Sequence, residues 1–223
     1  MPEFDVSRLG VGDRYKLLIG AVVPRPIALV SSVNRDGALN LAPFSFFNAV
    51  GSNPMLVMFC PANEPDGREK DSLRNAAPAD EGGMGEFVVN VVSEAIATRA
   101  VSASEPLAFG QSEFELSGLT PAPSRVVSPP RVAESPVSFE CRTRRVDRFA
   151  PDAGMGANMV IGEVVWVHAA DGLVNERFHT DPSSLSAVGR MGGRGYARTR
   201  ERFDLPMGRA ALDADPGAAA TER

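Results

Sequence analysis

Short apolar segments that alternate with hairpin turns are the feature of this sequence that most restricts its fold. Residues 27–33 are rich in aliphatic and β-branched side chains and lead directly into a turn at residues 34–37. Further strand-like segments lie at residues 38–42, 55–60, 86–92, 137–146 and 158–168. They do not alternate with helical segments long enough for βαβ units, so a parallel sheet is disfavoured. The pattern predicts an antiparallel barrel or sandwich with two or three helices on its outside.

The segments between the strands predict few helices. Helical stretches are expected at residues 13–20, 71–77 and 93–103. Ser93 is the expected cap of the last one, and residues 55–60 are expected to form a buried strand. The proline-rich residues 119–136 are expected to be irregular. From residue 210 the chain has no periodic pattern, so we predict one domain over residues 1–209 and a disordered tail over residues 210–223.

The charge balance restricts the partners. Lys plus Arg number 23 and Asp plus Glu number 28, which gives a formal net charge of −5. A dedicated nucleic-acid binder needs a basic face for counterion release, so no nucleic-acid partner is expected. The apolar runs are far shorter than the roughly 20 residues that cross a bilayer, and no secretory signal is visible. We therefore expect a soluble, cytoplasmic protein with no membrane partner, in which Cys60 and Cys141 are reduced, buried thiols.

Several common catalytic signatures are missing from the sequence. It contains no GxGxxG, no GxxxxGK[ST] and no GxSxG, which argues against a Rossmann domain, a P-loop nucleotide site and a hydrolase nucleophile elbow. The two histidines, His168 and His179, lie outside any HExxH pattern, and the cysteines have no zinc-ligand spacing. We expect no metal site from this pattern.

Two apolar segments are interrupted by polar side chains. Ser31 and Ser32 interrupt the first, and Ser45 and Asn48 interrupt residues 44–50. A buried hydroxyl without a partner costs about 1–3 kcal/mol, so each group must either bond to neighbouring protein atoms or face a ligand. For one pair alone the first interpretation is favoured. Two interruptions that flank the same hairpin favour the second interpretation, in which these polar groups face the edge of a polar ligand.

Two further clusters could bind an anion. Lys70, Asp71 and Ser72 begin a predicted helix, where backbone N–H groups and a lysine could hold a phosphate. The alternative is an ordinary helix cap with the lysine in water. Residues 189–198 combine glycines with three arginines and Tyr196, a set that can hold an anion and a flat ring. The alternative for this segment is a flexible basic loop.

Taken together, these segments resemble the flavin reductase-like, FMN-binding split-barrel family, to which flavoredoxin belongs. The most specific blocks are residues 23–32 (VPRPIALVSS) and residues 40–48 (NLAPFSFFN). Supporting blocks lie at residues 36–37, 53–57, 70–72, 86–91, 161–164 and 190–196. The similarity covers roughly residues 13–205.

The resemblance implies a six-stranded antiparallel Greek-key split barrel with a few peripheral helices, which forms a homodimer and binds FMN near the subunit interface. Ser31 and Ser32 would lie along the ring and ribityl chain, and Lys70 and Ser72 would reach the phosphate. Residues 190–196 would close over the cofactor, from the same subunit or from its partner. The full set of cofactor-binding residues implied in this way is Arg25, Ser31, Ser32, Ala42, Pro43, Ser45, Asn48, Lys70, Asp71, Ser72, Asn90, Arg190 and Tyr196.

For function, the resemblance implies an NADH- or NADPH-dependent flavin oxidoreductase of the flavin reductase type. FMN would be its cofactor or substrate, and a monooxygenase or another electron acceptor its partner. Hydride transfer between two bound rings needs orientation and exclusion of water rather than an acid–base pair, so no catalytic side chain is expected. Two alternatives stay open at this point. The protein could carry electrons between proteins without a nicotinamide, or it could be a non-enzymatic barrel that binds a phosphate-bearing ligand.

Overall fold

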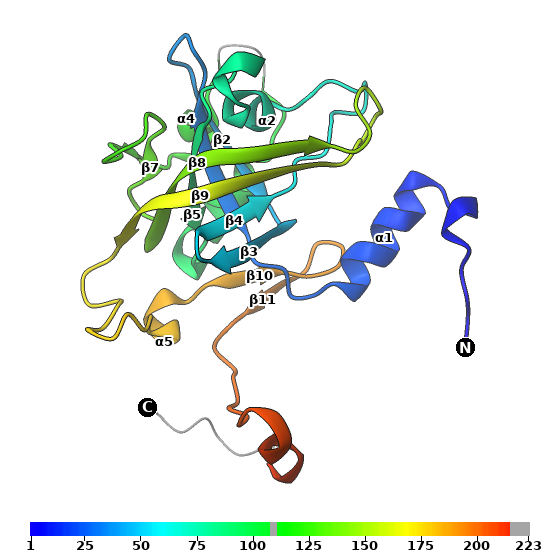
Figure 1. Cartoon of the computed structure of the whole chain (residues 1–223), viewed down its shortest axis with the longest axis vertical. Helices are drawn as coiled ribbons and strands as arrows, with labels where there is room; N and C mark the ends of the chain where they lie inside the picture. The colour runs from blue at the N-terminus through cyan, green and yellow to red at the C-terminus, as the bar shows by residue number, and fades with distance from the viewer. Residues whose placement is uncertain (108–110, 215–223) are drawn as a thin grey trace.

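The computed structural model describes residues 1–107 and 111–214. Its centre is a strongly twisted antiparallel sheet of seven strands in the order β2-β1-β5-β8-β9-β4-β3 (Figure 1). These strands are β1 (Ala28–Val33), β2 (Leu39–Phe44), β3 (Phe47–Ser52), β4 (Met55–Phe59), β5 (Glu86–Val91), β8 (Val137–Arg148) and β9 (Asn158–Ala169). Two small ribbons accompany the sheet, formed by β6 (Pro121–Ala122) with β7 (Arg131–Val132) and by β10 (Val188–Arg190) with β11 (Tyr196–Arg198). The mainly β, antiparallel class predicted from the sequence is confirmed.

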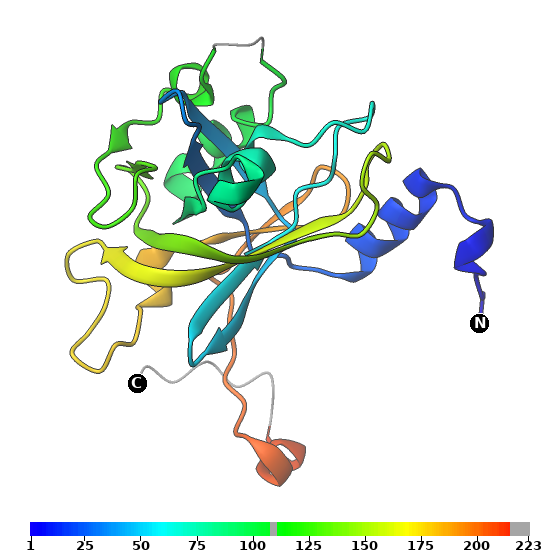
Figure 2. The same ribbon diagram turned by 45° about the horizontal axis from the view of Figure 1, so that its top comes forward.

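Short helices lie outside the sheet. They are α1 (Val11–Ala21), α2 (Asp71–Ala76), α3 (Ala97–Ser102), α4 (Glu113–Ser117) and α5 (Pro182–Leu185), with 3-10 turns η1 (Val6–Arg8), η2 (Ala79–Glu81), η3 (Glu94–Ile96) and η4 (Gly208–Asp213). Figures 1 and 2 show α1 extending away from the sheet. None of the helices in the described residues reaches the length and hydropathy of a membrane-spanning segment.

β1 is buried on both faces, which accounts for its nearly continuous apolar sequence. Successive side chains of a strand point to opposite faces. Ala28 and Val30 face a core cluster to which α2 contributes Leu73. Leu29 faces a second cluster, to which α4 contributes Phe114. The helices therefore close a hydrophobic core on each side of this strand.

Gly162 stands in the middle of β9, at a position where a branched side chain would ordinarily favour the strand. A Cβ atom here would lie 2.4 Å from Cζ of Phe87 and 3.1 Å from Cβ of Cys141. Phe87 is fully buried and packs edge-on against Phe59, with ring centroids 5.1 Å apart. The glycine therefore leaves room for the aromatic cluster at the centre of the core.

The sheet has seven strands where the prediction was six. Residues 47–52, expected only as part of an interrupted apolar stretch, form β3 and pair with β4. β3 is an edge strand and is exposed over most of its length, so it lacks the alternation typical of a half-buried strand. β4 is not the fully buried strand predicted, because Val57 and Phe59 face the core while Met55 is 43 % exposed.

Other differences are local. Ser93 precedes the turn η3 and then the short helix α3 in place of one continuous helix, and its side chain makes no capping hydrogen bond. The proline-rich residues 119–136 contain only the two-residue strands β6 and β7 and are otherwise irregular, as predicted. Cys141 is buried, whereas Cys60 is only partly buried, and both are free thiols.

The domain boundary stays a prediction. The turn η4 spans the expected boundary at residue 210. Residues 215–223 of the predicted tail lie outside the described residues.

Candidate functional site

Two adjoining pockets lie beside β2, where segments distant in the sequence meet. The first, which we call the apolar pocket, has a volume of about 250 Å³, and the second, the charged pocket, about 310 Å³. Pro43 of β2 and Ser104, which follows α3, line both of them. Taken together, the two volumes fall within the range of roughly 300–1,000 Å³ that is typical of small-molecule sites.

Several separate segments line the apolar pocket. α1 supplies Tyr15, the connection between β2 and β3 supplies Ser45, and the β10–β11 ribbon supplies Arg190 and Tyr196. The remaining lining residues, mostly small or aliphatic, are Ile27, Pro43, Val92, Ala97, Ala100, Val101 and Ser104. A lining of this kind suits a flat, mostly apolar ligand.

The charge in the apolar pocket is positive. Arg190 stacks over the ring of Tyr196, with Cζ 4.5 Å from the ring centroid. Its Nη2 donates a hydrogen bond to the carbonyl oxygen of Gly193 at 2.7 Å. None of the described residues that line this pocket is a carboxylate. A negative charge that forms on a ligand here would therefore lie near the cation Arg190.

The charged pocket opens at the start of α2. Lys70 occupies the N-cap position of α2 and makes no capping hydrogen bond with its side chain. In the described part of the chain, the cations that line this pocket are Lys70, Arg68 and Arg74. Each pairs with a carboxylate, and the pair of Lys70 with Glu64, at 3.7 Å, is the longest of the three. An incoming anion can therefore replace the existing carboxylate partner of Lys70 more readily than the partners of the two arginines.

A chain of polar side chains ties the charged pocket to the sheet. Nδ2 of Asn40 donates to Oγ of Ser72 at 2.9 Å and to Oγ of Ser32 at 3.2 Å. Nδ2 of Asn75, on α2, donates to the same Ser32 oxygen at 3.0 Å. Asn40 and Ser72 line the pocket, whereas Ser32 is fully buried beneath them. The network holds α2 against the β1–β2 hairpin and fixes the position of Ser72.

Glu113 of α4 is a half-buried carboxylate in the charged pocket. Burial raises the pKa of Glu113 above its ordinary value, although the backbone N–H of Leu41, which donates to Oε2 at 3.0 Å, acts in the opposite direction. β2 is an edge strand, so this bond satisfies a backbone donor that the sheet leaves free. In its ionised form Glu113 opposes the binding of any anion in this pocket.

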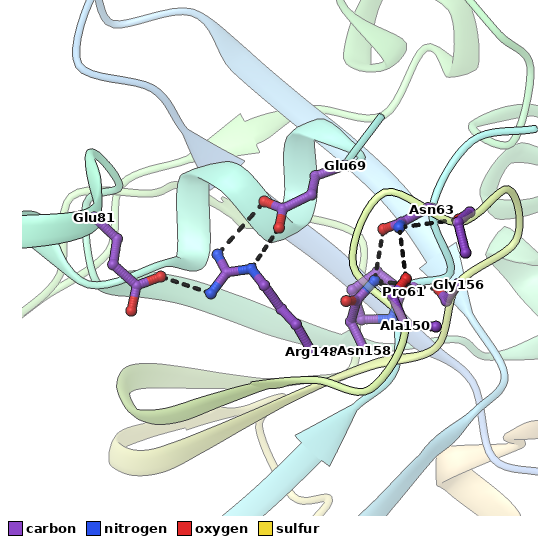
Figure 3. Close-up of polar contacts among 9 residues, drawn as sticks. Pro61, Asn63, Glu69, Glu81, Arg148, Ala150, Gly156 and Asn158 are labelled. Atoms are coloured by element: carbon purple, nitrogen blue, oxygen red, sulfur yellow. Dashed lines mark hydrogen bonds and ion pairs between the residues drawn. The ribbon is translucent and has the colours of Figure 1, made fainter. Parts of the chain in front are cut away.

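The loop that leads into α2 is held by the tip of the β8–β9 hairpin. Arg148, at the end of β8, lies between Glu69 and Glu81 and bonds to both, with 2.7 Å between Nη1 and the Glu81 oxygen (Figure 3). A Cβ atom on Gly154 would lie 2.4 Å from the carbonyl oxygen of Pro65, so the two backbones are in direct contact. The segment before Lys70 therefore has a rigid support.

Two asparagines complete this contact. Nδ2 of Asn158, which is 2 % exposed, donates to Oδ1 of Asn63 at 2.8 Å and to the carbonyl oxygen of Pro61 at 2.9 Å (Figure 3). The backbone N–H of Asn63 in turn donates to the carbonyl oxygen of Gly156 at 2.9 Å. Hydrogen bonds as well as packing therefore hold this loop against the tip of the β8–β9 hairpin.

Replacing Arg148 by methionine is expected to lower the free energy of unfolding by about 1 kcal/mol, the upper end for partly exposed ion pairs. The variant keeps the aliphatic stem and loses both carboxylate partners, Glu69 and Glu81. Urea unfolding measures the change. Arg177→Met, at an exposed arginine, is the matched control and is expected to match the wild type. Equal stability of both variants would show that the ion pairs do not support the loop.

Most of the predicted site residues line the two pockets. They are Ala42, Pro43, Ser45, Lys70, Asp71, Ser72, Arg190 and Tyr196. Arg190 and Tyr196 reach the apolar pocket of their own chain. Asn48 does not join them, because it is exposed on the edge strand β3, where its Oδ1 accepts a hydrogen bond from the N–H of Ala49. Arg25 is 4 % exposed and bonds to Ser45 from behind the pocket.

Three other predicted site residues lie in the interior. Ser31, Ser32 and Asn90 have no exposed surface. Ser31 donates to the carbonyl oxygen of Pro130 at 2.5 Å, and Nδ2 of Asn90 donates to the carbonyl oxygen of Leu29 at 3.0 Å. Their polar atoms have partners within the protein and reach neither pocket. The site proposed below therefore does not include them.

Sequence reasoning missed the site residues that helices contribute. Tyr15 of α1 and Ser104, just after α3, line the apolar pocket. Ala97 and Ala100, three positions apart on α3, place small side chains on one helix face, and Ser104 follows in the turn after the helix. That stripe was the available signal for a wall that leaves room for a ligand.

Comparison with known proteins places the chain in a family. The family model described as "Flavin reductase like domain" matches residues 19–182. A protein of Halalkalibacterium halodurans is 40% identical over 197 residues, which are 86% of this chain and 90% of that protein.

Solved structures agree with this match. Nitrilotriacetate monooxygenase component B from Bacillus cereus has a TM-score of 0.84 at 34% identity, over 92% of this chain and 98% of that one. Pseudomonas fluorescens 2-nitrobenzoate 2-nitroreductase NbaA has a TM-score of 0.81 at 32% identity, over 93% of this chain and 97% of that one. Since the family match and these relatives cover most of the chain, the protein belongs to the flavin reductase-like split-barrel family.

Proposed function

We propose that this protein binds FMN across the two pockets and is an NADH- or NADPH-dependent flavin oxidoreductase. The observation that carries the proposal is the position of the apolar pocket, which no carboxylate within residues 1–107 and 111–214 lines, beside the charged pocket, which holds three cations together with carboxylates. FMN has the matching form, a flat ring joined by a short chain to a phosphate that carries about −1.5 to −2 charges at neutral pH. Membership of the family supports a flavin as the ligand.

The residues present fit this ligand at both ends. The small side chains of α3 leave room for a ring, and Arg190 and Tyr196 can cover it. Ser45 offers a hydroxyl to the same pocket. At the other end, Lys70 and the hydroxyl of Ser72 would hold the phosphate.

Bound FMN would supply the redox chemistry, taking two electrons from a nicotinamide and passing them to an acceptor. The role of the protein is to orient the ring, to exclude water and to keep positive charge near the place where negative charge forms on the ring. Among the residues that the structure describes, no histidine, cysteine or carboxylate lines the apolar pocket. The residues there are expected to act through position and charge.

A titration with FMN tests the proposal. Purified protein incubated with FMN and desalted is expected to stay yellow, and anaerobic mixing with NADH or NADPH in stopped flow is expected to bleach it. Yellow protein that ignores both nucleotides would contradict the nicotinamide donor and leave a carrier of electrons between proteins. Protein that stays colourless would contradict FMN binding itself and leave a barrel for another phosphate-bearing ligand.

The names of two relatives suggest two acceptors. One relative is component B of a monooxygenase, which favours delivery of reduced flavin to a partner enzyme. The other is a nitroreductase, which favours direct reduction of a small aromatic substrate over the apolar pocket. Faster NAD(P)H consumption on addition of 2-nitrobenzoate would support the second.

We place either reaction in the cytoplasm, where Cys60 and Cys141 would stay reduced.

We propose that a second copy of the chain covers α1. Only Ile19 of this 11-residue helix is buried, and an isolated helix of that length is marginal in water. Its exposed apolar residues are Val11, Tyr15, Leu17 and Leu18. Tyr15 lines the apolar pocket, so a partner seated on α1 would complete one wall of it. Light scattering after size exclusion is expected to give the mass of a dimer, and a monomer would contradict the proposal.

Replacing Glu113 by glutamine is expected to tighten FMN binding by about two- to tenfold, since it removes a negative charge worth roughly 0.5–1.5 kcal/mol from the phosphate end. The pKa of Glu113 is raised, so the difference from the wild type should shrink as the pH falls and the carboxyl becomes protonated. Quenching of flavin fluorescence measures the dissociation constant. Glu115→Gln, exposed on the same helix, is the control. Unchanged or weaker binding by Glu113→Gln would contradict this role.

A further inference from the structure

Arg25 is a buried cation directly behind the apolar pocket. It is 4 % exposed, and each of its guanidinium nitrogens donates to oxygen. The acceptors are the carbonyl oxygens of Ile19 at 2.8 Å, Val22 at 2.6 Å and Met191 at 3.1 Å, and Oγ of Ser45 at 3.3 Å. None of them is a carboxylate.

Among the residues that the structure describes, no carboxylate forms an ion pair with Arg25, whose Cζ lies 5.9 Å from the centroid of the Phe46 ring. Buried guanidinium groups ordinarily pair with carboxylates, because taking an unpaired charge out of water is costly. Neutral oxygens satisfy the N–H groups of Arg25 and do not neutralise it. A residue that costs stability in this way points to a functional role.

Ser45 directs the effect of this charge into the pocket. A hydroxyl has one hydrogen to donate and lone pairs with which to accept. Oγ of Ser45 accepts from Nε of Arg25, and within residues 1–107 and 111–214 its own hydrogen has no acceptor in the protein. Ser45 lines the apolar pocket, so its O–H is available to a ligand there. A hydroxyl bonded to a cation is also a stronger donor.

We infer that Arg25 is a positioning residue that makes Ser45 a polarised hydrogen-bond donor to the bound ring and thereby raises the reduction potential of the flavin. This inference rests on the proposed function and adds to it a residue that sets the driving force. A ring that gains electrons gains negative charge, so a stronger donor stabilises the reduced form more than the oxidised form.

The backbone of Arg25 reinforces the same arrangement. Its N–H donates to the carbonyl oxygen of Arg190 at 2.9 Å, and the N–H of Arg190 donates back at 2.8 Å. Arg25 therefore fixes the β10–β11 ribbon, which carries Arg190 and Tyr196, relative to Ser45. Arg25 therefore holds in place both the polarised hydroxyl of Ser45 and the guanidinium of Arg190, which are the two groups that create positive potential at this pocket.

A double-mutant cycle tests the inference, with Ser45→Ala, Arg25→Lys and the two combined. The readouts are the midpoint potential of bound FMN, titrated against a reference dye, and the FMN dissociation constant. Ser45→Ala is expected to weaken reduced FMN about tenfold more than oxidised FMN, which lowers the potential of a two-electron couple by about 30 mV. Arg25→Lys keeps the charge and loses the planar fork. It is expected to lower the potential in the wild-type background and to have no further effect in the Ser45→Ala background.

Two more variants keep the test decisive. Ser45→Thr retains a hydroxyl and is expected to keep the wild-type potential, as is Ser52→Ala at the exposed end of β3. An unchanged potential in Ser45→Ala, a loss in Ser45→Thr equal to that in Ser45→Ala, or equal effects of Arg25→Lys in both backgrounds would each overturn the inference. A wild type that binds no FMN would overturn the proposed function and the inference with it. A wild type that binds FMN, with a potential indifferent to Ser45, would overturn the inference alone.

Discussion

Replacing Glu140 by alanine is expected to lower the free energy of unfolding by about 2–4 kcal/mol. Glu140 has no exposed surface. Its carboxylate accepts hydrogen bonds from the backbone N–H groups of Arg125 at 2.6 Å and Val126 at 2.7 Å, and Nε2 of His168 lies 2.6 Å away. Alanine removes the acceptor from all three donors at once. Urea unfolding followed by the fluorescence of Trp166, the single tryptophan, measures the loss.

The pH dependence of this loss has a defined sign. Burial by itself raises the pKa of Glu140, but the N–H of Arg125, the side chain of His168 and the N–H of Val126 together hold it below its ordinary value of 4.5. A carboxylate with a lowered pKa stabilises the fold above the pKa of the unfolded chain, and this contribution is lost as the pH falls through the folded pKa. The difference between wild type and Glu140→Ala should therefore be full at pH 7 and shrink below about pH 4.5.

Two control variants distinguish the effect of the Glu140 carboxylate from the effect of losing one partner or any other carboxylate. His168→Ala removes one of the three partners and is expected to cost about 1 kcal/mol. Glu176→Ala, at an exposed carboxylate, is expected to change nothing. A Glu140→Ala variant as stable as the wild type, or a difference that grows on acidification, would show that Glu140 does not anchor the proline-rich segment.

The sequence predicted the elements whose signals are local. The run at β1 and the turn before Leu39 depend on side-chain pattern and turn chemistry within a few residues, and both are confirmed. β3 carries no such pattern, because an exposed edge strand needs no apolar face. Only its pairing with β4 makes it a strand.

The site residues show the same limit. Ser31, Ser45 and Asn90 look alike in the sequence, as polar groups within apolar segments. Whether each one meets protein or ligand depends on distant parts of the chain. Ser31 bonds to Pro130, 99 positions away, whereas the O–H of Ser45 has no acceptor in the described part of the protein. Glu140 is a further case, because alternation places it on the polar face of β8 and the proline-rich segment then buries its carboxylate.

Replacing Lys70 by alanine is expected to raise the dissociation constant of FMN by roughly 10- to 150-fold. This corresponds to the loss of a charge-assisted hydrogen bond worth about 1.5–3 kcal/mol. Lys70 is the cation with the longest ion pair in the charged pocket, 3.7 Å to Glu64, so the phosphate competes with a weak partner for it. The expected effect falls at high salt, because the contact is partly exposed. Quenching of flavin fluorescence at two salt concentrations measures both points.

Riboflavin, which is FMN without its phosphate, separates a phosphate contact from a change in the fold. Lys70→Ala is expected to bind riboflavin as the wild type does, since the ring occupies the other pocket. Glu64→Gln removes the competing carboxylate and is expected to tighten FMN binding with no effect on riboflavin. The chain contains one other lysine, Lys16 on α1, which pairs with Asp13 at the surface, and Lys16→Ala serves as the matched control. Equal loss of FMN and riboflavin affinity in Lys70→Ala would mean that the lysine supports the pocket's shape. An unchanged dissociation constant for FMN would mean that another cation binds the phosphate. The assignment of the ring to the apolar pocket and of the phosphate to the charged pocket depends on Lys70.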